Sequence, residues 1–451
     1  MVQTSATIPS RTNALPPVPQ PTPVSAIGEI VACARRTQPA WAALGRDERA
    51  RLIGLAATEL TSRAEEIGAL ASREMGKPRR EAIGEANHCA ASIAASAQEV
   101  ARALAPEMLE DATVSSELRF DPLGIAACIT PWNFPIAMPQ DVVVPSLVAG
   151  NTVVLKPSEK TPRCGDAWAQ CLMAHLPEGV LQVIHGDEVQ GKALVQADVN
   201  LIAFVGSRAA GKHIMREAAS GLKRLVLELG GKDALIVLED ADIDAAVAFA
   251  TRNCFRNAGQ VCVGTERIFV HASVAQAFTQ ALAIRAAALI QGDPADEATQ
   301  IGPMADASQA SHVRASIDDA LRHGATLVTG GLGDGDYVKP TVLTGVTDAM
   351  RIMREETFGP VACIIPVASD DEAIRRANGT PFGLGGSVFG EREHALRVAR
   401  ALDTGMVGIN KGCGGADGCP WVGAKESGFG YHSGTAGHRQ FAQTRVISVA
   451  R

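Results

Sequence analysis

The chain has 451 residues, 46% of them hydrophobic and 20% charged, which is the composition of a soluble globular protein. Its formal net charge of −7 at pH 7 offers no basic surface for nucleic acid or for a membrane. No apolar run approaches the roughly 18–20 residues that a membrane-spanning helix needs, so neither nucleic acid nor a membrane is an expected partner. At about 100–200 residues per domain, the length predicts two to four folding units.

The first 25 residues are rich in proline, serine and threonine, and they lack the basic and apolar segments of a secretion signal. Such a segment buries too little surface to fold, so we expect residues 1–25 to form a flexible arm. Apolar residues at helical spacing then predict three helices, at about 27–41, 46–71 and 79–104.

Short apolar runs alternate with helical segments in the rest of the chain. A first group of strands is predicted at 114–120, 124–130, 152–156, 180–185, 201–205, 224–228 and 234–238. A second set alternates strands at 267–270, 326–329, 363–366, 386–389 and 407–410 with helices at 243–253, 274–289, 307–323, 371–378 and 393–402. This alternation indicates parallel sheets covered on both faces. The two sets meet at Gly230-Gly231 and predict two lobes with a ligand site between them.

Two strand ends suggest a nucleotide site. The strand at 201–205 ends in Gly206-Ser207 and leads into a helix, a context that suits a phosphate held by helix N–H groups. The turn lacks the strict GxGxxG pattern, and a Gly/Ser turn at a strand end is structural more often than not. Lys156 and Glu159 follow another strand, where Glu159 could accept hydrogen bonds from a ribose diol. A solvated ion pair in a loop is the alternative.

A cysteine and a glutamate are the candidate reactive groups. The ten cysteines are too sparse for a disulfide scaffold and lack the spacing of a zinc site, so we expect no metal and reduced, mostly buried thiols in a cytoplasmic protein. Cys262 differs because it closes a glycine-containing turn, where N–H groups can stabilise a thiolate. Glu228 lies among leucines, where burial would raise its pKa and suit it to act as a base. A glutamate satisfied by backbone N–H groups is equally compatible with this pattern.

Taken together, these segments resemble the aldehyde dehydrogenase superfamily from about Gln38 to the C-terminus. The motifs occur in family order: PWNFP at 131–135, LKPSEKTP at 155–162, FVGS at 204–207, LELGGKD at 227–233, NAGQVCVGTERI at 257–268, EETFGPV at 355–361 and KESGFG at 425–430. The most specific part is LELGGK followed at this interval by NxGQxC.

The resemblance implies a role for each matching residue. Cys262 matches the nucleophile, Glu228 the general base, and Asn133 the side chain that forms the oxyanion hole with the Cys262 N–H. NAD is the implied cofactor, with NADP possible, because a carboxylate at Glu159 repels a 2′-phosphate whereas Lys156 and Ser158 leave some room for one. The implied cofactor contacts are Trp132, Lys156, Ser158, Glu159, Phe204, Gly206, Ser207, Leu229, Gly230, Glu356 and Phe358.

The implied reaction is the oxidation of an aldehyde to the carboxylic acid with NAD(P)+. A thiohemiacetal and then a thioester form on Cys262, and water activated by Glu228 hydrolyses the thioester. Two alternatives stay open: a CoA-acylating aldehyde dehydrogenase, against which Glu228 argues, and a catalytically silent relative with a binding or structural role.

The residues expected around the substrate depart from the family pattern. Val142 replaces a lysine common about nine residues after Asn133, and the usual Phe-Gly of the C-terminal segment is Trp421-Val422. Arg256 occupies a place where relatives often have an apolar residue. It is either a solvated arginine at a helix end or a group that attracts an aldehyde with a distal carboxylate. The candidate substrate contacts are Phe134, Arg256 and Trp421.

The resemblance also implies an α/β, two-lobed fold with a Rossmann-like nucleotide-binding lobe, an αβ catalytic lobe and a small β oligomerisation ribbon. Residues 26–105 and 122–229 are expected to form the NAD-binding lobe, and residues 230–430 the catalytic lobe. Residues 106–121 and 431–451 are expected to form the bridging ribbon. A ribbon of this kind exposes a sheet edge, so we expect a homodimer or homotetramer.

Overall fold

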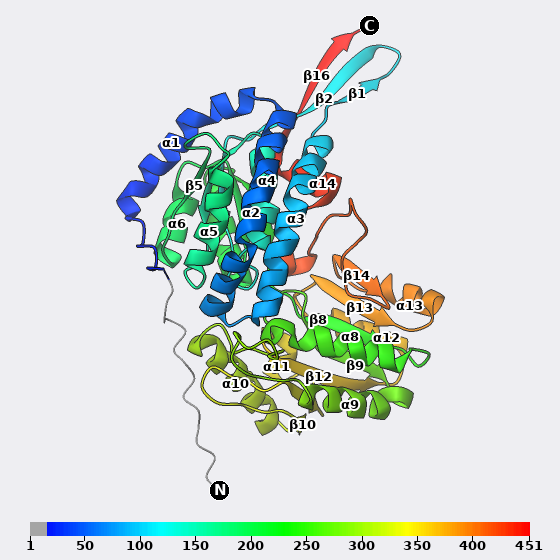
Figure 1. Ribbon diagram of the computed structural model, residues 1–451. Helices are drawn as coiled ribbons and strands as arrows, with labels where there is room; N and C mark the ends of the chain where they lie inside the picture. The colour runs from blue at the N-terminus through cyan, green and yellow to red at the C-terminus, as the bar shows by residue number, and fades with distance from the viewer. Residues whose placement is uncertain (1–15) are drawn as a thin grey trace.

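Two mostly parallel sheets, each covered by helices, form the body of the molecule, and a third, antiparallel sheet projects from it (Figure 1). The structure is a computed structural model that describes residues 16–451. The α/β architecture is the one that the alternating sequence pattern predicts. None of the helices formed by residues 16–451 is long and apolar enough to cross a membrane.

The first sheet has six strands in the order β15-β7-β6-β3-β4-β5, all parallel except the edge strand β15. Its strands are β3 (Ile125–Ile129), β4 (Thr152–Lys156), β5 (Leu181–Val183), β6 (Leu201–Val205), β7 (Arg224–Glu228) and β15 (Gly428–Phe429). We expected residues 428–429 in the catalytic lobe, but they pair with β7 in this sheet. A two-residue strand carries no sequence periodicity from which this pairing could be predicted.

Helices cover both faces of the first sheet. They are α1 (Val24–Ala43), α2 (Arg46–Met75), α3 (Arg79–Ala103), α4 (Ala137–Val148), α5 (Pro162–Met173), α6 (Glu188–Gln196) and α7 (Arg208–Ala219). Alternate residues of β3 point to opposite faces: Ala126 and Cys128 pack under α2–α5, whereas Ile125 and Ala127 pack under α1, α6 and α7. The strands are therefore buried on both sides, as continuous apolar runs require.

The second sheet has seven strands in the order β10-β11-β12-β9-β8-β13-β14, with only β10 antiparallel. Its strands are β8 (Asp233–Val237), β9 (Thr265–His271), β10 (Thr326–Thr329), β11 (Thr341–Thr344), β12 (Val361–Val367), β13 (Gly385–Phe389) and β14 (Met406–Ile409). The helices of this part are α8 (Ile243–Phe255), α9 (Ala272–Ala287), α10 (Ala307–Arg322), α11 (Arg351–Arg354), α12 (Asp370–Asn378) and α13 (Arg392–Ala399).

The third sheet is a ribbon in the order β1-β2-β16, and the C-terminus lies at its tip (Figure 1). It consists of β1 (Glu107–Glu110), β2 (Val114–Pro122) and β16 (Ala442–Ala450). The short helix α14 (Gly434–His438) precedes β16 and packs on α3. Residues 106–121 and 442–450 thus lie together, although they are far apart in the sequence.

The expected flexible arm covers residues 1–25, and its described part, residues 16–25, is held by hydrogen bonds. Residues 1–15 lie outside the described residues. The Thr22 N–H donates to the His185 carbonyl (2.9 Å), and the His185 N–H donates to Thr22 Oγ1 (3.0 Å). The chain that leads into α1 is therefore anchored beside the end of β5, through backbone groups that composition alone does not reveal.

Candidate active site

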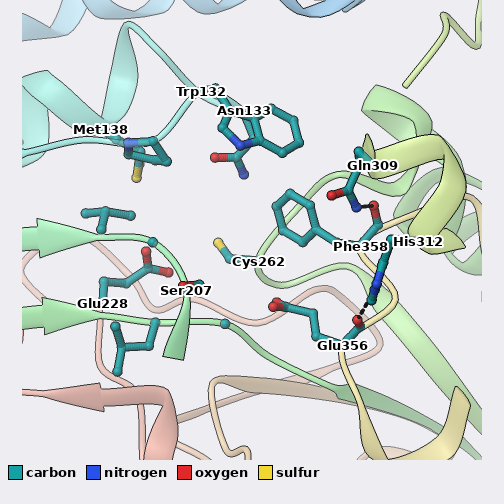
Figure 2. Close-up of a pocket in the computed structure, with 15 residues that line it drawn as sticks. Trp132, Asn133, Met138, Ser207, Glu228, Cys262, Gln309, His312, Glu356 and Phe358 are labelled. Atoms are coloured by element: carbon teal, nitrogen blue, oxygen red, sulfur yellow. Dashed lines mark hydrogen bonds between the residues drawn. The ribbon is translucent and has the colours of Figure 1, made fainter. Parts of the chain in front are cut away.

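A cavity of about 330 Å³ lies where the carboxyl ends of β6 and β7 meet the loop before β9 (Figure 2). It brings together residues from distant parts of the chain: Trp132, Asn133, Gly206, Ser207, Glu228, Leu229, Gly230, Cys262, Glu356 and Phe358. All ten were predicted as site residues. The cavity also has lining residues that the sequence analysis did not predict, and these are Pro131, Met138, Val205, Gln309 and His312.

A second cavity of about 650 Å³ continues from the first. Trp132, Gly206 and Ser207 line both cavities, and the second extends over α6 and α7. The other predicted cofactor residues lie here: Lys156, Ser158, Glu159 and Phe204. The two cavities together form an extended groove along the carboxyl edge of the first sheet, the usual place for a ligand in an α/β sheet.

The loop that carries Cys262 has an unusual backbone. Asn257 and Ala258 have positive φ angles of 51° and 53°, and Gly259 follows at 72°. A side chain at residue 259 would place its Cβ 2.1 Å from the Gly359 carbonyl oxygen, so only glycine fits there. The buried side chain of Gln260 fixes the loop. It donates to the Asn257 carbonyl within the loop (2.9 Å), and it accepts the N–H of Ala305 outside the loop (2.9 Å).

This backbone presents the Cys262 side chain and amide to the cavity. The Sγ atom lies between Glu228 and Glu356, below Asn133 (Figure 2). Asn133 is 5% exposed, and its Nδ2 donates to the Gln260 carbonyl at 3.2 Å, two residues before Cys262. The Cys262 N–H has no hydrogen-bond partner within residues 16–451. Two donors, one from a side chain and one from the backbone, are thus available next to the sulfur.

Glu228 ends β7 in an apolar environment. Its side chain is 6% exposed, and its Oε1 is buried without a hydrogen-bond partner among the described residues. Burial raises the pKa of Glu228 to about 7, against the opposing effects of the neighbouring Cys262 thiol and Trp421 indole. Burial and the nearby carboxyl of Glu228 raise the pKa of the Cys262 thiol well above its ordinary value. The resting site therefore favours a neutral thiol beside a carboxyl that titrates near neutral pH.

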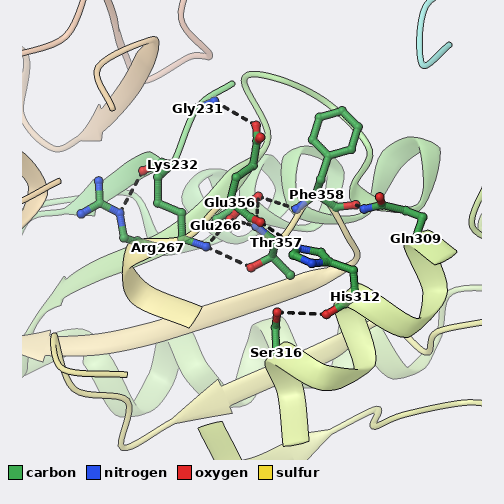
Figure 3. A network of polar contacts seen from close by, with 10 residues as sticks. All are labelled: Gly231, Lys232, Glu266, Arg267, Gln309, His312, Ser316, Glu356, Thr357 and Phe358. Atoms are coloured by element: carbon green, nitrogen blue, oxygen red, sulfur yellow. Dashed lines mark hydrogen bonds and ion pairs between the residues drawn. The ribbon is translucent and has the colours of Figure 1, made fainter. Parts of the chain in front are cut away.

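A buried ion pair holds the loop that carries Glu356 and Phe358 (Figure 3). The ammonium of Lys232 pairs with Glu266 and donates to Thr357 Oγ1 at 3.0 Å. Glu266 also accepts the N–H groups of Thr357 and Phe358. Because most of these contacts are buried, they hold the loop firmly against the cavity.

Helix α10 supplies the residues that the sequence analysis missed. Gln309 Nε2 donates to the Phe358 carbonyl (3.0 Å), and His312 Nε2 lies 3.1 Å from the Glu356 carbonyl (Figure 3). Glu356 Oε1 accepts the Gly231 N–H at 2.9 Å, and burial raises its pKa to about 8. The lining of the cavity thus depends on α10, whose only sequence feature is its helical period.

The predicted substrate residues lie outside the first cavity. Phe134 and Trp421 pack with Cys262 against an apolar cluster that consists of Val261, Val263, Leu384 and Met406. Arg256 instead lines another cavity together with Trp421. Among the described residues, no group of three or more His, Cys, Asp and Glu side chains could hold a metal ion.

Comparison with known proteins gives the family. The model of the family described as "Aldehyde dehydrogenase family" matches residues 6–447. The chain belongs to this family. It is 37% identical to the betaine aldehyde dehydrogenase of Rhizobium johnstonii over 437 residues, 94% of this chain and 89% of the relative. It is also 35% identical to the peroxisomal aminoaldehyde dehydrogenase 1 of Pisum sativum, over 92% of this chain and 86% of that protein.

Solved structures agree with this assignment. The NAD-dependent aldehyde dehydrogenase of Sinorhizobium meliloti superposes with a TM-score of 0.92 at 34% identity, over 95% of this chain and 88% of that one. PnpE in complex with nicotinamide adenine dinucleotide superposes with a TM-score of 0.90 at 35% identity, over 94% of this chain and 90% of PnpE. The chain is an NAD(P)-dependent aldehyde dehydrogenase with the two-domain fold of that family.

The raised pKa of Glu228 predicts how the free energy of unfolding depends on pH. The pKa of Glu228 is about 7 in the folded protein and near its ordinary 4.5 in the unfolded chain. Its contribution to the free energy of unfolding is therefore fully present below pH 4.5 and is lost as the pH rises through 7. The Glu228→Gln variant cannot ionise, so relative to the parent it should gain up to about 3 kcal/mol between about pH 5 and pH 8. Urea unfolding measures this gain, and a difference that does not change with pH would contradict the raised pKa.

Proposed function

We propose that the enzyme oxidises its aldehyde to the carboxylic acid by the hydrolytic route, with Cys262, Glu228 and Asn133 as its catalytic groups. The observation that carries this proposal is the buried carboxyl of Glu228 beside the Cys262 thiol, with an Oε1 that has no hydrogen-bond partner among the described residues. A thiol with a raised pKa needs a base to release its proton, and a carboxyl that titrates near 7 can accept it.

Two donors beside the sulfur explain how the first step is stabilised. As the Cys262 sulfur bonds to the carbonyl carbon, the carbonyl oxygen becomes an anion. Asn133 Nδ2 and the Cys262 N–H are placed to donate to that oxygen. Because the donors are fixed before the reaction, losing one typically raises the barrier by about 3–4 kcal/mol.

Glu228 has a second task after the oxidation. Bound NAD(P)+ supplies the hydride acceptor, and the product of that step is a thioester on Cys262. Once Glu228 has passed the thiol proton to solvent, it deprotonates a water molecule, which attacks the thioester carbon and releases the carboxylic acid and the Cys262 thiolate. The pKa near 7 suits both proton transfers because the carboxyl is neither fully charged nor fully protonated at neutral pH.

The groove fits an extended dinucleotide. Lys156, Ser158 and Glu159 line its outer part, and the turn before α7 lies at its middle. A Cβ on Gly206 would lie 2.5 Å from the Phe204 ring, so the turn has no room for a side chain, and Ser207 begins the helix by accepting the Ala210 N–H. A helix N-terminus at this place suits a pyrophosphate. Lys156 and Glu159, whose charged atoms lie 3.6 Å apart, are assigned to the adenosine ribose, and Glu356 and Phe358 to the nicotinamide end.

The compartment follows from the chemistry of the nucleophile. All ten cysteines are free, and a catalytic thiol has to stay reduced. The cytoplasm is the compartment that meets this requirement.

The two candidate substrate classes differ in the charge at the far end of the aldehyde. Relatives are named for betaine aldehyde and for aminoaldehydes, which makes a cationic aldehyde one candidate. The half-buried Arg256 favours the other candidate, an aldehyde with a negative far end.

Two variants separate the chemical steps. Cys262→Ser should lower kcat/KM for NAD reduction with small aldehydes by at least about three orders of magnitude, since the nucleophile is lost. Glu228→Gln should form NADH more slowly than the parent, because the thiol loses its base, and should stop after about one equivalent per site, because its thioester is not hydrolysed. Stopped-flow absorbance measures both. Full turnover by the Gln variant, or a CoA requirement in the parent, would contradict the hydrolytic route.

The charge of Glu159 should set the choice of cofactor. Glu159→Gln removes the repulsion of a 2′-phosphate and should raise the ratio of kcat/KM with NADP to that with NAD by about tenfold, or about 1.4 kcal/mol. Glu178→Gln is the control, since Glu178 is exposed and lies outside the groove. Steady-state kinetics with both cofactors give the ratio, and equal ratios in the two variants would refute the assignment.

The ribbon should join subunits into a homodimer or homotetramer. β16 pairs with β2 along one edge, which leaves its other edge free, and Val446 and Val449 are 61% and 66% exposed. The double variant Val446→Glu/Val449→Glu should therefore have a lower mass by light scattering than the parent. Ile284→Glu, on the exposed face of α9, should leave the mass unchanged. A monomeric parent would remove the proposal.

A further inference from the structure

A third cavity, of about 390 Å³, lies behind Trp421 and outside the groove. Its charged lining consists of Arg252, Arg256, Lys411 and one acid, Asp233. Arg252 lies in the last turn of α8, Arg256 begins the turn after it, and Lys411 follows β14. Three cations from two separate parts of the chain therefore converge on one cavity.

The three cations lack ion-pair partners among residues 16–451. None of them forms an ion pair with a carboxylate within 4.0 Å, whereas many other arginines of the described chain do, for example Arg376 with Asp348. Lys411 Nζ donates only to the Gly414 carbonyl, and Arg256 Nε is buried without an acceptor. A buried donor without a partner is costly, so the cavity is arranged for an anion that the protein itself does not supply.

The nearby acids do not cancel this charge. Asp233 accepts the Gly385 N–H (3.1 Å), and burial raises its pKa to about 8, so it is mostly uncharged at neutral pH. Glu81 of α3 faces Arg256 without an ion pair, and burial raises its pKa as well. The cavity therefore keeps a net positive charge, and the exposed Arg252 and Lys411 place its mouth at the surface.

The cavity starts one side chain away from the reacting sulfur. Val263, Cys413 and Trp421 line it. Cys413 and Trp421 pack against the same apolar cluster as Cys262, and the Trp421 indole is close enough to influence the pKa of Glu228. Cys413 and Trp421 are thus shared by the cavity and the surroundings of Cys262, and the apolar stem of an aldehyde bonded to Cys262 would extend past them to bring its far end to the cations.

We propose that this cavity binds the far end of the substrate, and that the substrate is an aldehyde whose far end is an oxyanion, a carboxylate or a phosphate, held by Arg252, Arg256 and Lys411. The proposal rests on the proposed function, because it requires the aldehyde carbon to react at Cys262. Guanidinium groups bind such oxyanions through two parallel hydrogen bonds. Since the cations lie beyond Trp421, a stem of several carbons fits better than the shortest acidic aldehydes.

The test compares aldehydes of equal stem length that end in a carboxylate, a phosphate, a methyl ester or a trimethylammonium group. The parent should prefer one or both anionic ends over the ester by at least tenfold in kcat/KM, and the anion with the larger ratio identifies the natural end group. Arg256→Met and Lys411→Met should each lower that ratio by about tenfold, and the double variant should abolish it. Arg256→Glu should shift the preference toward trimethylammonium. Arg285→Met is the control, because Arg285 is an exposed arginine in the last turn of α9, and it should keep the parent ratio.

A binding measurement adds a readout that does not depend on turnover. A dicarboxylate of matching length should inhibit oxidation of a neutral aldehyde competitively, with a Ki at least tenfold below that of its monomethyl ester, and Lys411→Met should remove the difference. Equal ratios for charged and neutral aldehydes in the parent, or ratios unaffected by Arg256→Met and Lys411→Met, would overturn the subsite while aldehyde oxidation persists. Failure to oxidise any aldehyde would instead overturn the proposed function.

Discussion

The site depends on the buried ion pair between Lys232 and Glu266. Lys232 follows the glycines where the chain passes from the first sheet to the second, and Glu266 lies in β9. Their contacts fix the Thr357–Phe358 backbone, so one interaction ties together the inter-lobe connection, the strand after the Cys262 loop and the loop with Glu356. Loss of one partner of such a pair leaves an uncompensated buried charge, which typically costs about 3–5 kcal/mol.

The same principle, burial of ionisable groups, sets the chemistry. Glu228 and Cys262 are kept from water, and Glu228 also disfavours the thiolate form of Cys262, so the resting thiol is neutral beside a carboxyl that titrates near neutral pH. In the cavity behind Trp421 the arrangement is opposite, because three cations line it and form no ion pair among the described residues. The two sides of Trp421 therefore differ in kind: one side suits proton transfer, and the other suits recognition of charge.

The sequence was sufficient to predict the groups that lie in short motifs. Cys262, Glu228 and Asn133 each belong to a local pattern, and the alternation of apolar runs with helices predicted both parallel sheets. Contacts between distant segments were not predictable in this way. Gln309 and His312 line the cavity only because α10 packs beside the Glu356 loop, and β15 is too short to show a period. Arg252 and Lys411 line the same cavity although they are far apart in the sequence, and no pattern in either segment predicts that the two residues lie close together.

The segment 427–429 links the two lobes from the far end of the chain. Gly428 pairs with Glu228 itself, the Leu229 N–H donates to the Ser427 carbonyl (2.9 Å), and Ser427 Oγ donates to the Gly230 carbonyl (2.7 Å). The backbone at Glu228 is thus held by a segment that follows the whole second sheet in the sequence. The first sheet is therefore complete only when the chain has passed through the second sheet and returned, which couples the folding of the two lobes to the placement of the base.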